Sequence, residues 1–356
     1  MGLFQLDFLR VYLLIILLSI YLLASSQSTG YYGFQNSSLP TYSLAMTTIP
    51  PRFPHLAPTL LSWLHQVHKP NRICIYIPVS YKRFRKKGAA SSMSLSTYDL
   101  LMKHLVNNPQ INLAIESKIV RVVLLEKDFG PISKLVGVLM EQKNLDSNRY
   151  TSNISNCYER NENLPNFWIF GDDDVEYSQY TILKYNYYIS NYHITDMFSL
   201  SDWNTNHFVL TQFVETYRIF YDILFADGDI KRIVPRHLQG VDTYLISTNS
   251  FLNNWEHFGI FHFKTALAII DFFHDSCPES FYQDDYLVSF LVSLANIPIY
   301  TIWNNDKLTS HVEGVSLSNF QMHRDPKVNF REETTKSCIY TYANDIYQRL
   351  LKDIKT

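Results

Sequence analysis

Strand-like and helix-like stretches alternate along this chain, and their alternation constrains its fold more than any other feature of the sequence. Short apolar or β-branched runs predict strands at residues 42–48, 73–77, 119–125 and 167–170. Between them, apolar residues at helical spacing predict helices at residues 56–66, 96–106 and 133–142. Strands that alternate with helices in this way predict an α/β fold, in which a mostly parallel sheet is flanked by helices.

Two local features refine this pattern. Ser96 is the expected N-cap of the helix that follows it, because its hydroxyl can accept a hydrogen bond from the first turn. Residues 143–166 are polar, and we interpret them as a surface loop that leads into the strand at 167–170.

Composition sets the class of protein. The 356 residues suffice for one large α/β domain or two modest ones with an ample core. Apolar residues make up 46% and charged residues 18%, which is typical of a packed globular protein and excludes a largely disordered chain. The formal net charge of −2 gives no overall attraction to nucleic acid, so no nucleic-acid partner is expected. We interpret the basic run at residues 82–87 as a solvated loop.

An apolar segment near the N-terminus predicts that the chain enters the secretory pathway, either anchored in the membrane or secreted. Residues 11–24 are apolar except for one serine and two tyrosines, and the segment is shorter than the ~20 residues that span a bilayer. Residues up to Ser26 extend it, and Arg10 can reach the interface. Two interpretations fit: a signal anchor, which we favour, and a signal peptide cleaved near Ala24. Both place the bulk of the chain in the secretory pathway.

The cysteines and the glycosylation sequons are compatible with a location in the secretory pathway. Sequons begin at Asn36 and Asn153. The cysteines lack the spacing of metal ligands, and in an oxidising lumen we predict a disulfide between Cys277 and Cys338. Cys74 lies in an apolar run and is expected to be a buried free thiol.

Three aspartates follow directly after the apolar strand at 167–170. In open α/β sheets, ligands bind beyond the carboxyl ends of the strands. Asp172, Asp173 and Asp174 repel one another there unless a cation neutralises them. Oxygen ligands suit Mg²⁺ or Mn²⁺, so Asp172 and Asp174 can share a metal that also holds a diphosphate. The competing interpretation is a turn of solvated aspartates that caps the next helix.

Two further positions carry charge at predicted helix starts. Lys134 follows a glycine turn at the start of a helix, where an anion such as phosphate binds favourably. Asp284 and Asp285 open an apolar helix. The alternatives are a solvated helix face for Lys134 and ordinary helix capping for the two aspartates.

In their order along the chain, these segments resemble a family. The order is TTIPPR at residues 47–52, FGPISKL at 129–135, GDDDVEY at 171–177, a glutamine–glycine pair before a strand at 239–240, and QDDYLVSFL at 283–291. This set resembles the GT-A-fold nucleotide-sugar glycosyltransferases, in particular a group with GPATK-like, DDD and SDD-like segments. The resemblance spans residues 42–302. The chain departs from the pattern at Ile132, Ser133 and Gln283.

The resemblance implies roles for individual residues. Asp172 and Asp174 would bind Mn²⁺ or Mg²⁺ and the diphosphate of the nucleotide-sugar donor, and Asp173 would orient them or contact the ribose. Asp285, or alternatively Asp284, would act as the general base on a hydroxyl of a glycan-type acceptor and invert the anomeric centre.

The same resemblance implies further contacts to the donor. Arg52 would contact the nucleotide and Lys134 the diphosphate or the base. A histidine late in the domain would be a third metal ligand, and His311 and His323 are the candidates.

The resemblance also implies how the chain divides into parts and where the protein is located, and it leaves two alternative functions open. The expected parts are a signal anchor or signal peptide at 1–26, a short stem at 27–40, a lumenal GT-A-like catalytic domain at 41–345 and a C-terminal tail at 346–356. The expected location is the ER or Golgi membrane, in single-pass type II orientation, or the exterior if the N-terminal segment is cleaved. The alternatives to a transferase are a carbohydrate-binding relative without turnover and a metal-dependent phosphoesterase.

Overall fold

The structure is a computed structural model. It describes residues 40–81, 96–146, 156–159, 162–191, 209–211, 214–215, 237–238, 243–248, 263–278, 281, 284–294, 299–301, 309–311, 338 and 341. None of the helices in these parts is long and apolar enough to cross a membrane. The predicted anchor and stem, both sequons, the glutamine–glycine pair, Gln283, His323 and the predicted C-terminal tail lie outside the described residues.

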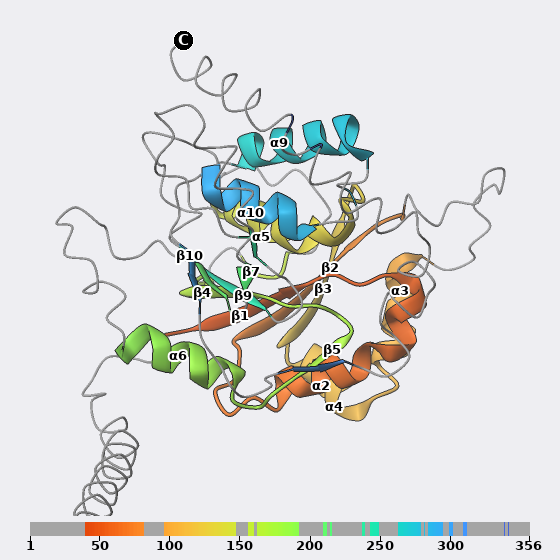
Figure 1. The fold of residues 1–356 in the computed structure, drawn as a ribbon. Helices are drawn as coiled ribbons and strands as arrows, with labels where there is room; N and C mark the ends of the chain where they lie inside the picture. Colours follow the sequence, from red (N-terminus) through yellow and green to blue (C-terminus); the bar gives the residue numbers. More distant parts are fainter. Residues whose placement is uncertain are drawn as a thin grey trace, which may run out of the picture.

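A seven-stranded sheet forms the centre of the described structure (Figure 1). Its strand order is β10-β6-β9-β4-β1-β2-β3. Strand β9 is antiparallel to both of its neighbours, and the other pairings in this sheet are parallel. The predicted mostly parallel sheet is therefore confirmed. The strands are β1 (Tyr42–Met46), β2 (Arg72–Pro78), β3 (Val120–Leu125), β4 (Phe167–Phe170), β6 (Val209–Thr211), β9 (Tyr244–Ser247) and β10 (Ile299–Thr301).

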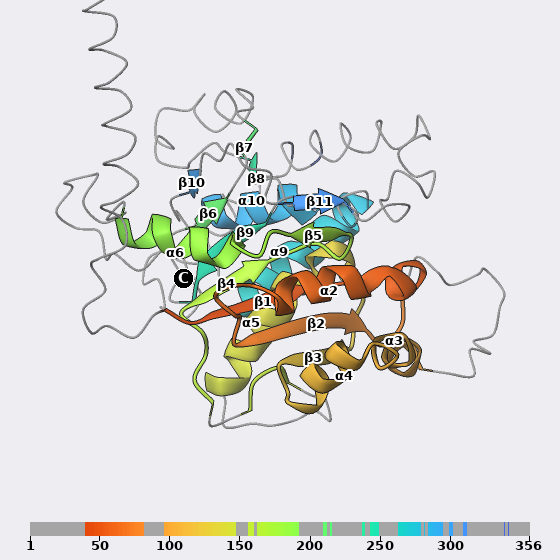
Figure 2. The same ribbon diagram turned by 90° about the horizontal axis from the view of Figure 1, so that it is seen from below.

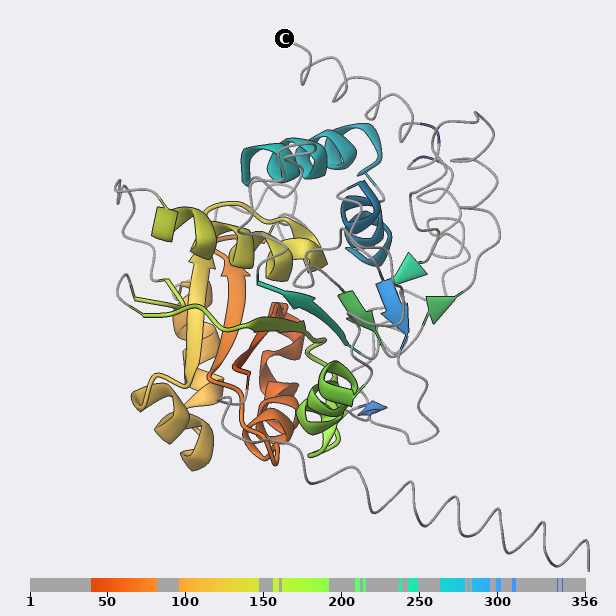
Figure 3. The same ribbon diagram turned by 90° about the vertical axis from the view of Figure 1, so that its left-hand side faces the viewer.

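Helices cover both faces of this sheet, as predicted (Figures 1 and 3). On one face lie α5 (Ser133–Asp146), α9 (Phe263–Ser276) and α10 (Asp284–Leu294). On the other lie α2 (Leu56–Leu64), α3 (Thr97–Leu105), α4 (Pro109–Glu116) and α6 (Thr181–Asn191). Short 3-10 helices, η1 (Pro50–His55) and η3 (Gly130–Ile132), lead into α2 and α5.

The alternation of side chains along each strand divides the core into two layers. In β1, Leu44 and Met46 pack into the layer under α2, whereas Ala45 packs into the layer under α5. Successive residues of a strand point to opposite faces, so a strand buried on both faces is apolar throughout. In β2, Tyr76 lies under α5 so closely that a Cβ at Gly137 would lie 2.1 Å from its ring. This close approach requires glycine.

The helix and strand boundaries match the predictions with local differences. Ser96 accepts a hydrogen bond from the backbone of Asp99, which confirms it as the N-cap of α3. Helix α5 runs to Asp146 and so extends into the predicted loop. The sequence analysis did not predict α4, although Asn108 caps it and Pro109 occupies its first position.

Two disulfides are present. The predicted pair of Cys277 and Cys338 is confirmed. The prediction of a free thiol at Cys74 is wrong, because Cys74 in β2 is bonded to Cys157. The segment around Cys157 was interpreted as surface loop, yet Cys157 and Tyr158 are buried against the sheet.

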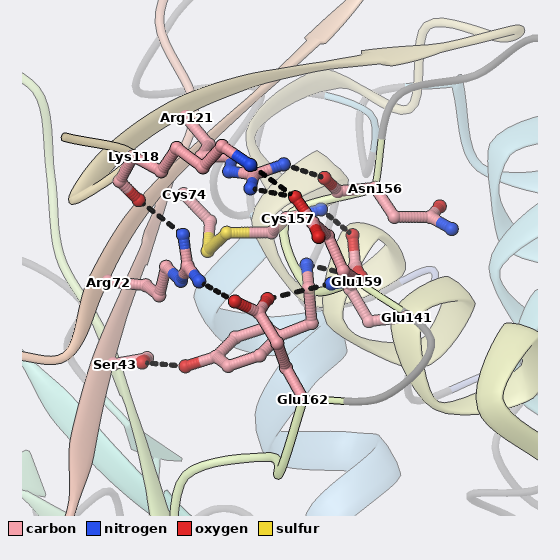
Figure 4. Close-up of a disulfide and its surroundings, with 11 residues drawn as sticks. Ser43, Arg72, Cys74, Lys118, Arg121, Glu141, Asn156, Cys157, Glu159 and Glu162 are labelled. Atoms are coloured by element: carbon pink, nitrogen blue, oxygen red, sulfur yellow. Dashed lines mark hydrogen bonds and ion pairs between the residues drawn. A yellow bond between two sulfur atoms is a disulfide. The ribbon is translucent and has the colours of Figure 1, made fainter. Parts of the chain in front are cut away.

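Charged residues surround the bond between Cys74 and Cys157 (Figure 4). Arg72 pairs with Glu162 and donates to the carbonyl of Lys118. Lys118 and Arg121 both pair with Glu159, at 2.7 and 2.9 Å. We call these five charged residues the amino-edge network, because they lie at or before the amino ends of β2, β3 and β4.

Two smaller sheets complete the described strands. Strand β5 (Val175–Tyr177) pairs antiparallel with β11 (Thr309–His311), which lies beside it in Figure 2. Strands β7 (Val214–Glu215) and β8 (His237–Leu238) form the other pair.

Candidate functional site at the topological switch point

The order of the strands creates a switch point between β1 and β4. From β1 the chain proceeds to β2 and β3 on one side, and β4 then pairs with the opposite side of β1. The carboxyl ends of β1 and β4 therefore lie side by side where the strand order reverses, the place where α/β sheets bind ligands. We call Asp172–Asp174, which follows β4, the acid turn.

Polar side chains in α2 and just after it hold the acid turn and the strand that follows the turn. The hydroxyl of Thr59 donates to the carbonyl of Asp173 at 3.1 Å. The hydroxyl of Ser62 accepts from the backbone N–H of Tyr177 at 3.0 Å, and Gln66 donates to the carbonyl of Ser178 at 2.7 Å. Thr59 and Ser62 lie on one face of α2, because their spacing is three residues, and Gln66 follows two residues after the end of the helix. The helix thus fixes the path of the chain that leaves the acid turn.

Tyr177 binds the backbone of the acid turn and packs against α2. Its hydroxyl accepts from the backbone N–H of Asp172 at 2.8 Å, and its ring packs on Trp63 with 4.4 Å between centroids. Burial, and then the neighbouring Asp172, raise the pKa of Tyr177 well above its ordinary value, so the hydroxyl stays protonated. A Cβ at Gly171 would lie 3.2 Å from this hydroxyl, so the glycine permits the close approach.

Arg52 neutralises two of the three carboxylates. It lies in η1, just after β1, and one guanidinium nitrogen pairs with Asp173 while another contacts Asp174 at 3.0 Å. All three side chains are largely buried. Burial opposes the charge of Arg52, but Asp173 and Asp174 together raise its pKa above the ordinary value. The family resemblance implies that Arg52 contacts the nucleotide; in the structure its guanidinium contacts Asp173 and Asp174 of the acid turn.

Lys134 neutralises the third carboxylate. Its ammonium lies 2.9 Å from Oδ1 of Asp172. The two partners differ in exposure: the side chain of Lys134 is 2% exposed and that of Asp172 is 30% exposed. The ring of Tyr244 in β9 faces the ammonium, with 5.9 Å to the ring centroid. The alternative of a solvated helix face is therefore wrong for Lys134, and the start of α5 lies next to the acid turn.

The glycine turn before Lys134 also contacts the segment that leads into α10. Gly130 has a φ of +70°, a left-handed conformation that favours glycine, and its N–H donates to buried Asp128 at 2.9 Å. A Cβ at Gly130 would lie 2.2 Å from the carbonyl oxygen of Phe281. Helix α10 begins at Asp284, so its first residues, including half-buried Asp285, belong to the same end of the molecule as Lys134.

Strand pairing places His311 next to the acid turn. In the pairing of β11 with β5, His311 lies opposite Val175, the residue that directly follows Asp174. The backbone of His311 is therefore one strand away from the acid turn, although more than a hundred residues separate them in sequence. The alternative candidate, His323, lies outside the described residues.

The chemistry of this site suits a divalent cation, but its own cations occupy the carboxylates. In the described part of the chain, no three His, Cys, Asp or Glu side chains are arranged around a possible metal position. Among the described residues, three carboxylates face two cations at this turn, which leaves one negative charge in that part of the chain. Within the same part, the buried Oδ2 of Asp173 and Oγ of Ser133 have no hydrogen-bond partner. The residual charge and the unpartnered carboxylate oxygen fit a hard cation with oxygen ligands.

Sequence reasoning missed the residues that support the site. Thr59, Ser62, Gln66 and Tyr177 were not proposed. A signal for Thr59 and Ser62 was present, because these polar residues recur at helical spacing on a helix that is largely apolar. Tyr177 offered no such signal, since a tyrosine in a short strand is ordinary core.

Comparison with known proteins yields only distant likeness. No protein-family model matches the chain, and no curated protein matches it. Two crystal structures of residues 1–349 of TarS from S. aureus are similar to it, one of them in complex with UDP-GlcNAc. Both share 10% sequence identity with a TM-score of 0.35, and cover 85% of this chain and 72% or 73% of the TarS chain. Likeness at this level assigns neither a fold family nor a function.

Proposed function

We propose that this protein is a GT-A-type glycosyltransferase, which transfers a sugar from a nucleotide-sugar donor to a hydroxyl group of a glycan-type acceptor. The observation that carries the proposal is the meeting of the acid turn with Lys134 beside the switch point, because Asp172 and Lys134 lie 2.9 Å apart. Carboxylates for a metal and a lysine for phosphate are the two groups that a nucleoside diphosphate needs.

Lys134 is the proposed diphosphate-binding residue. It is the second residue of α5, a helix of 14 residues, so the unpaired N–H groups of the helix start add partial positive charge. The Oγ of Ser133, buried without a partner among the described residues, is an additional donor at this helix start. An anion placed here gains from the ammonium and from the helix end together.

Asp172 and Asp174 are the proposed metal ligands, with His311 as the third. Bound Mg²⁺ or Mn²⁺ would supply positive charge to the departing diphosphate. The proposed role of Asp173 and Arg52 is to shape the acid turn, because their side chains pair with each other in a buried position. A contact of either residue with the nucleotide stays a prediction.

Asp285 is the proposed general base, with Asp284 as the alternative. The acceptor hydroxyl gives its proton to the carboxylate as its oxygen forms a bond to the anomeric carbon, and the bond from that carbon to the diphosphate breaks. Direct displacement of this kind inverts the anomeric centre. Asp285 is half-buried at the start of α10, where it can be reached from solvent.

A lumenal location is part of the proposal. Two disulfides are typical of an oxidising compartment and unusual in the cytosol. Anchoring of residues 1–26 in the ER or Golgi membrane stays a prediction, as does cleavage of the same segment.

Metal-dependent release of nucleotide tests the proposal. The full-length protein is incubated with UDP-, GDP- and CMP-sugars and Mn²⁺, and free nucleotide is measured with and without glycan acceptors. We expect release that requires Mn²⁺ and that falls by roughly 10²–10³-fold in Lys134→Met, because a group that stabilises developing charge is lost. Asp174→Ala should also lose release. The matched control is Lys118→Met, which removes a lysine–carboxylate pair at the opposite edge of the sheet.

Other outcomes of these experiments would indicate a different function. Binding of a nucleotide sugar without release, with every acceptor tried, indicates a carbohydrate-binding relative. Release of phosphate from simple esters indicates a phosphoesterase. Binding of no nucleotide sugar and no Mn²⁺ contradicts the proposal as a whole.

A further inference from the structure

We propose that Tyr177 is a positioning residue of the transferase, and that its hydroxyl sets the direction in which the carboxylate of Asp172 points. This inference rests on the proposed function and adds to it a residue that acts through Asp172. A phenylalanine would bury the same ring in the core, so burial of the ring alone leaves the hydroxyl unexplained. The contacts of that hydroxyl carry the proposal.

The regular bonding of β4 reaches Gly171, the residue directly before Asp172. The N–H of Gly171 donates to the carbonyl of Ala45 in β1 at 3.1 Å, which continues the parallel pairing of the two strands. The chain then turns at Asp173 and Asp174. Asp172 therefore lies where the sheet gives way to a turn, and contacts from outside the sheet determine how its backbone is oriented.

Tyr177 binds both backbone groups of Asp172. The N–H of Asp172 donates to the hydroxyl of Tyr177 at 2.8 Å, and the hydroxyl donates to the carbonyl of Asp172 over a longer 3.4 Å. The two groups flank the Cα atom, so contacts with both restrict the two soft dihedral angles of this residue. The direction of the bond from Cα to Cβ follows, and with it the region that the carboxylate reaches.

The carboxylate of Asp172 depends on this support more than its two neighbours do. The side chains of Asp173 and Asp174 are 5% and 12% exposed, and both contact Arg52. The side chain of Asp172 is 30% exposed, so packing restricts it less. Its backbone is where the protein can fix its position most firmly.

Helix α2 fixes the hydroxyl in turn. The ring of Tyr177 packs on Trp63, which is fully buried, and the backbone N–H of Tyr177 donates to Ser62. Both partners belong to α2. A side chain held by a helix is placed more precisely than one held by a loop. Tyr177 thus connects Asp172, at the start of a turn, to a regular element of the fold.

Gly171 leaves the space that this hydroxyl occupies. A Cβ at Gly171 would lie 3.2 Å from the hydroxyl oxygen of Tyr177 and 3.3 Å from Cδ1 of Leu44. Both distances are shorter than the ~3.5–4.0 Å of a relaxed contact between carbon atoms. A methyl group at this position would therefore displace the hydroxyl, the leucine or the backbone between them.

Calorimetry with a matched pair of variants tests the positioning role. Mn²⁺ is titrated into the full-length protein in a fixed excess of UDP or GDP. Tyr177→Phe keeps the ring and removes the hydroxyl, and we expect Mn²⁺ affinity to fall by about tenfold or more, as when a group that orients a metal ligand is lost. The control, Tyr158→Phe, removes another buried tyrosine hydroxyl, one that bonds to Ser43, and should leave Mn²⁺ affinity unchanged. Urea unfolding measures the stability of both variants.

A second substitution tests the same contact from the other side. We expect Gly171→Ala to weaken Mn²⁺ binding, because its Cβ displaces the hydroxyl of Tyr177. Combined with Tyr177→Phe it should cost less than it does alone, since the displaced group is already absent, so the two effects should be less than additive. If Tyr177→Phe does not fold, Gly171→Ala alone decides, and an unchanged Mn²⁺ affinity overturns the proposal.

The outcomes separate the positioning role from the proposed function. If Tyr177→Phe binds Mn²⁺ as tightly as the unsubstituted protein, or loses no more affinity than Tyr158→Phe, the positioning role is overturned and the transferase proposal stands. Fully additive effects in the combined variant have the same consequence. Failure of the unsubstituted protein to bind either Mn²⁺ or nucleotide overturns both proposals.

Discussion

The two edges of the central sheet both carry clusters of charge, but they hold them in different ways. At the carboxyl edge, buried ion pairs with Arg52 and Lys134 hold the acid turn, together with hydrogen bonds of Thr59 and Tyr177. At β2, a disulfide between Cys74 and Cys157 holds the chain, and the amino-edge network lies around it (Figure 4).

The charged side chains of the amino-edge network and those of the acid turn differ in their exposure to solvent. In the amino-edge network, the pair of Lys118 and Glu159 has side chains that are 60% and 54% exposed, so water screens their attraction. The two cations beside Glu159, Lys118 first, lower its pKa to about 2, but this exposed contact adds little to stability. The acid turn is buried, and desolvation makes its charges costly unless they stay paired. The proposed transferase would use this charge to bind its ligands.

Loss of Arg52 should show the largest effect. Arg52→Met leaves Asp173 and Asp174 buried without their cation, so we expect the free energy of unfolding to fall by about 3–5 kcal/mol. Urea unfolding followed by circular dichroism measures it. A fall no larger than that of Lys118→Met would show that water already solvates the acid turn, and the contrast between the two edges would disappear.

Loss of the disulfide between Cys74 and Cys157 should have the second largest effect on stability. Cys74→Ala combined with Cys157→Ala removes a crosslink that spans 83 residues, and we expect a loss of about 2–4 kcal/mol in the free energy of unfolding. Mn²⁺ and nucleotide binding of the folded variant should be unchanged, because Cys74 lies in β2, two strands away from β4 and the acid turn that follows it. Weakened binding at equal folded fraction would show that the two edges are coupled.

A buried carboxylate beside the disulfide should make stability depend on pH. Glu141 accepts from the backbone N–H groups of Cys157 and Tyr158, and burial raises its pKa to about 7. The folded protein therefore holds a proton that the unfolded chain has already lost, so stability should fall as pH rises from about 4.5 to about 7, by at most ~1.4 kcal/mol per pH unit.

Glu141→Gln isolates this contribution. The amide does not titrate, so the slope of unfolding free energy against pH should flatten over that interval. Denaturant unfolding at a series of pH values measures the slope. An unchanged slope would assign the pH dependence to other groups.

The smallest effect should come from the amino-edge network itself. Lys118→Met removes one exposed ion pair, and Arg121 still pairs with Glu159 at 2.9 Å. We expect no change in the free energy of unfolding beyond measurement error, at low salt or at high salt. A clear loss that salt abolishes would show that the network stabilises the fold.

Local patterns predicted most of the elements around the site. The strand at Phe167–Phe170, the N-cap at Ser96 and the start of α5 at Ser133 each follow from a few neighbouring residues. The pairing of Cys74 with Cys157 did not, because an apolar run suits a free thiol as well as a disulfide. Burial of Tyr158 was missed for a similar reason, because its hydroxyl bonds to Ser43, 115 residues away in sequence, and its ring packs on Trp168 of the buried strand β4.

The sequence by itself determined that this chain forms an α/β sheet and that an acid turn follows one of its strands, since strand alternation and helix periodicity are properties of neighbouring residues. Only the tertiary structure decided which cation meets which carboxylate. Arg52 and Asp173 are 121 residues apart and Lys134 and Asp172 are 38 apart, and the strand order alone brings them together. Charges act through space, so their partners are set by the fold and are absent from any local pattern.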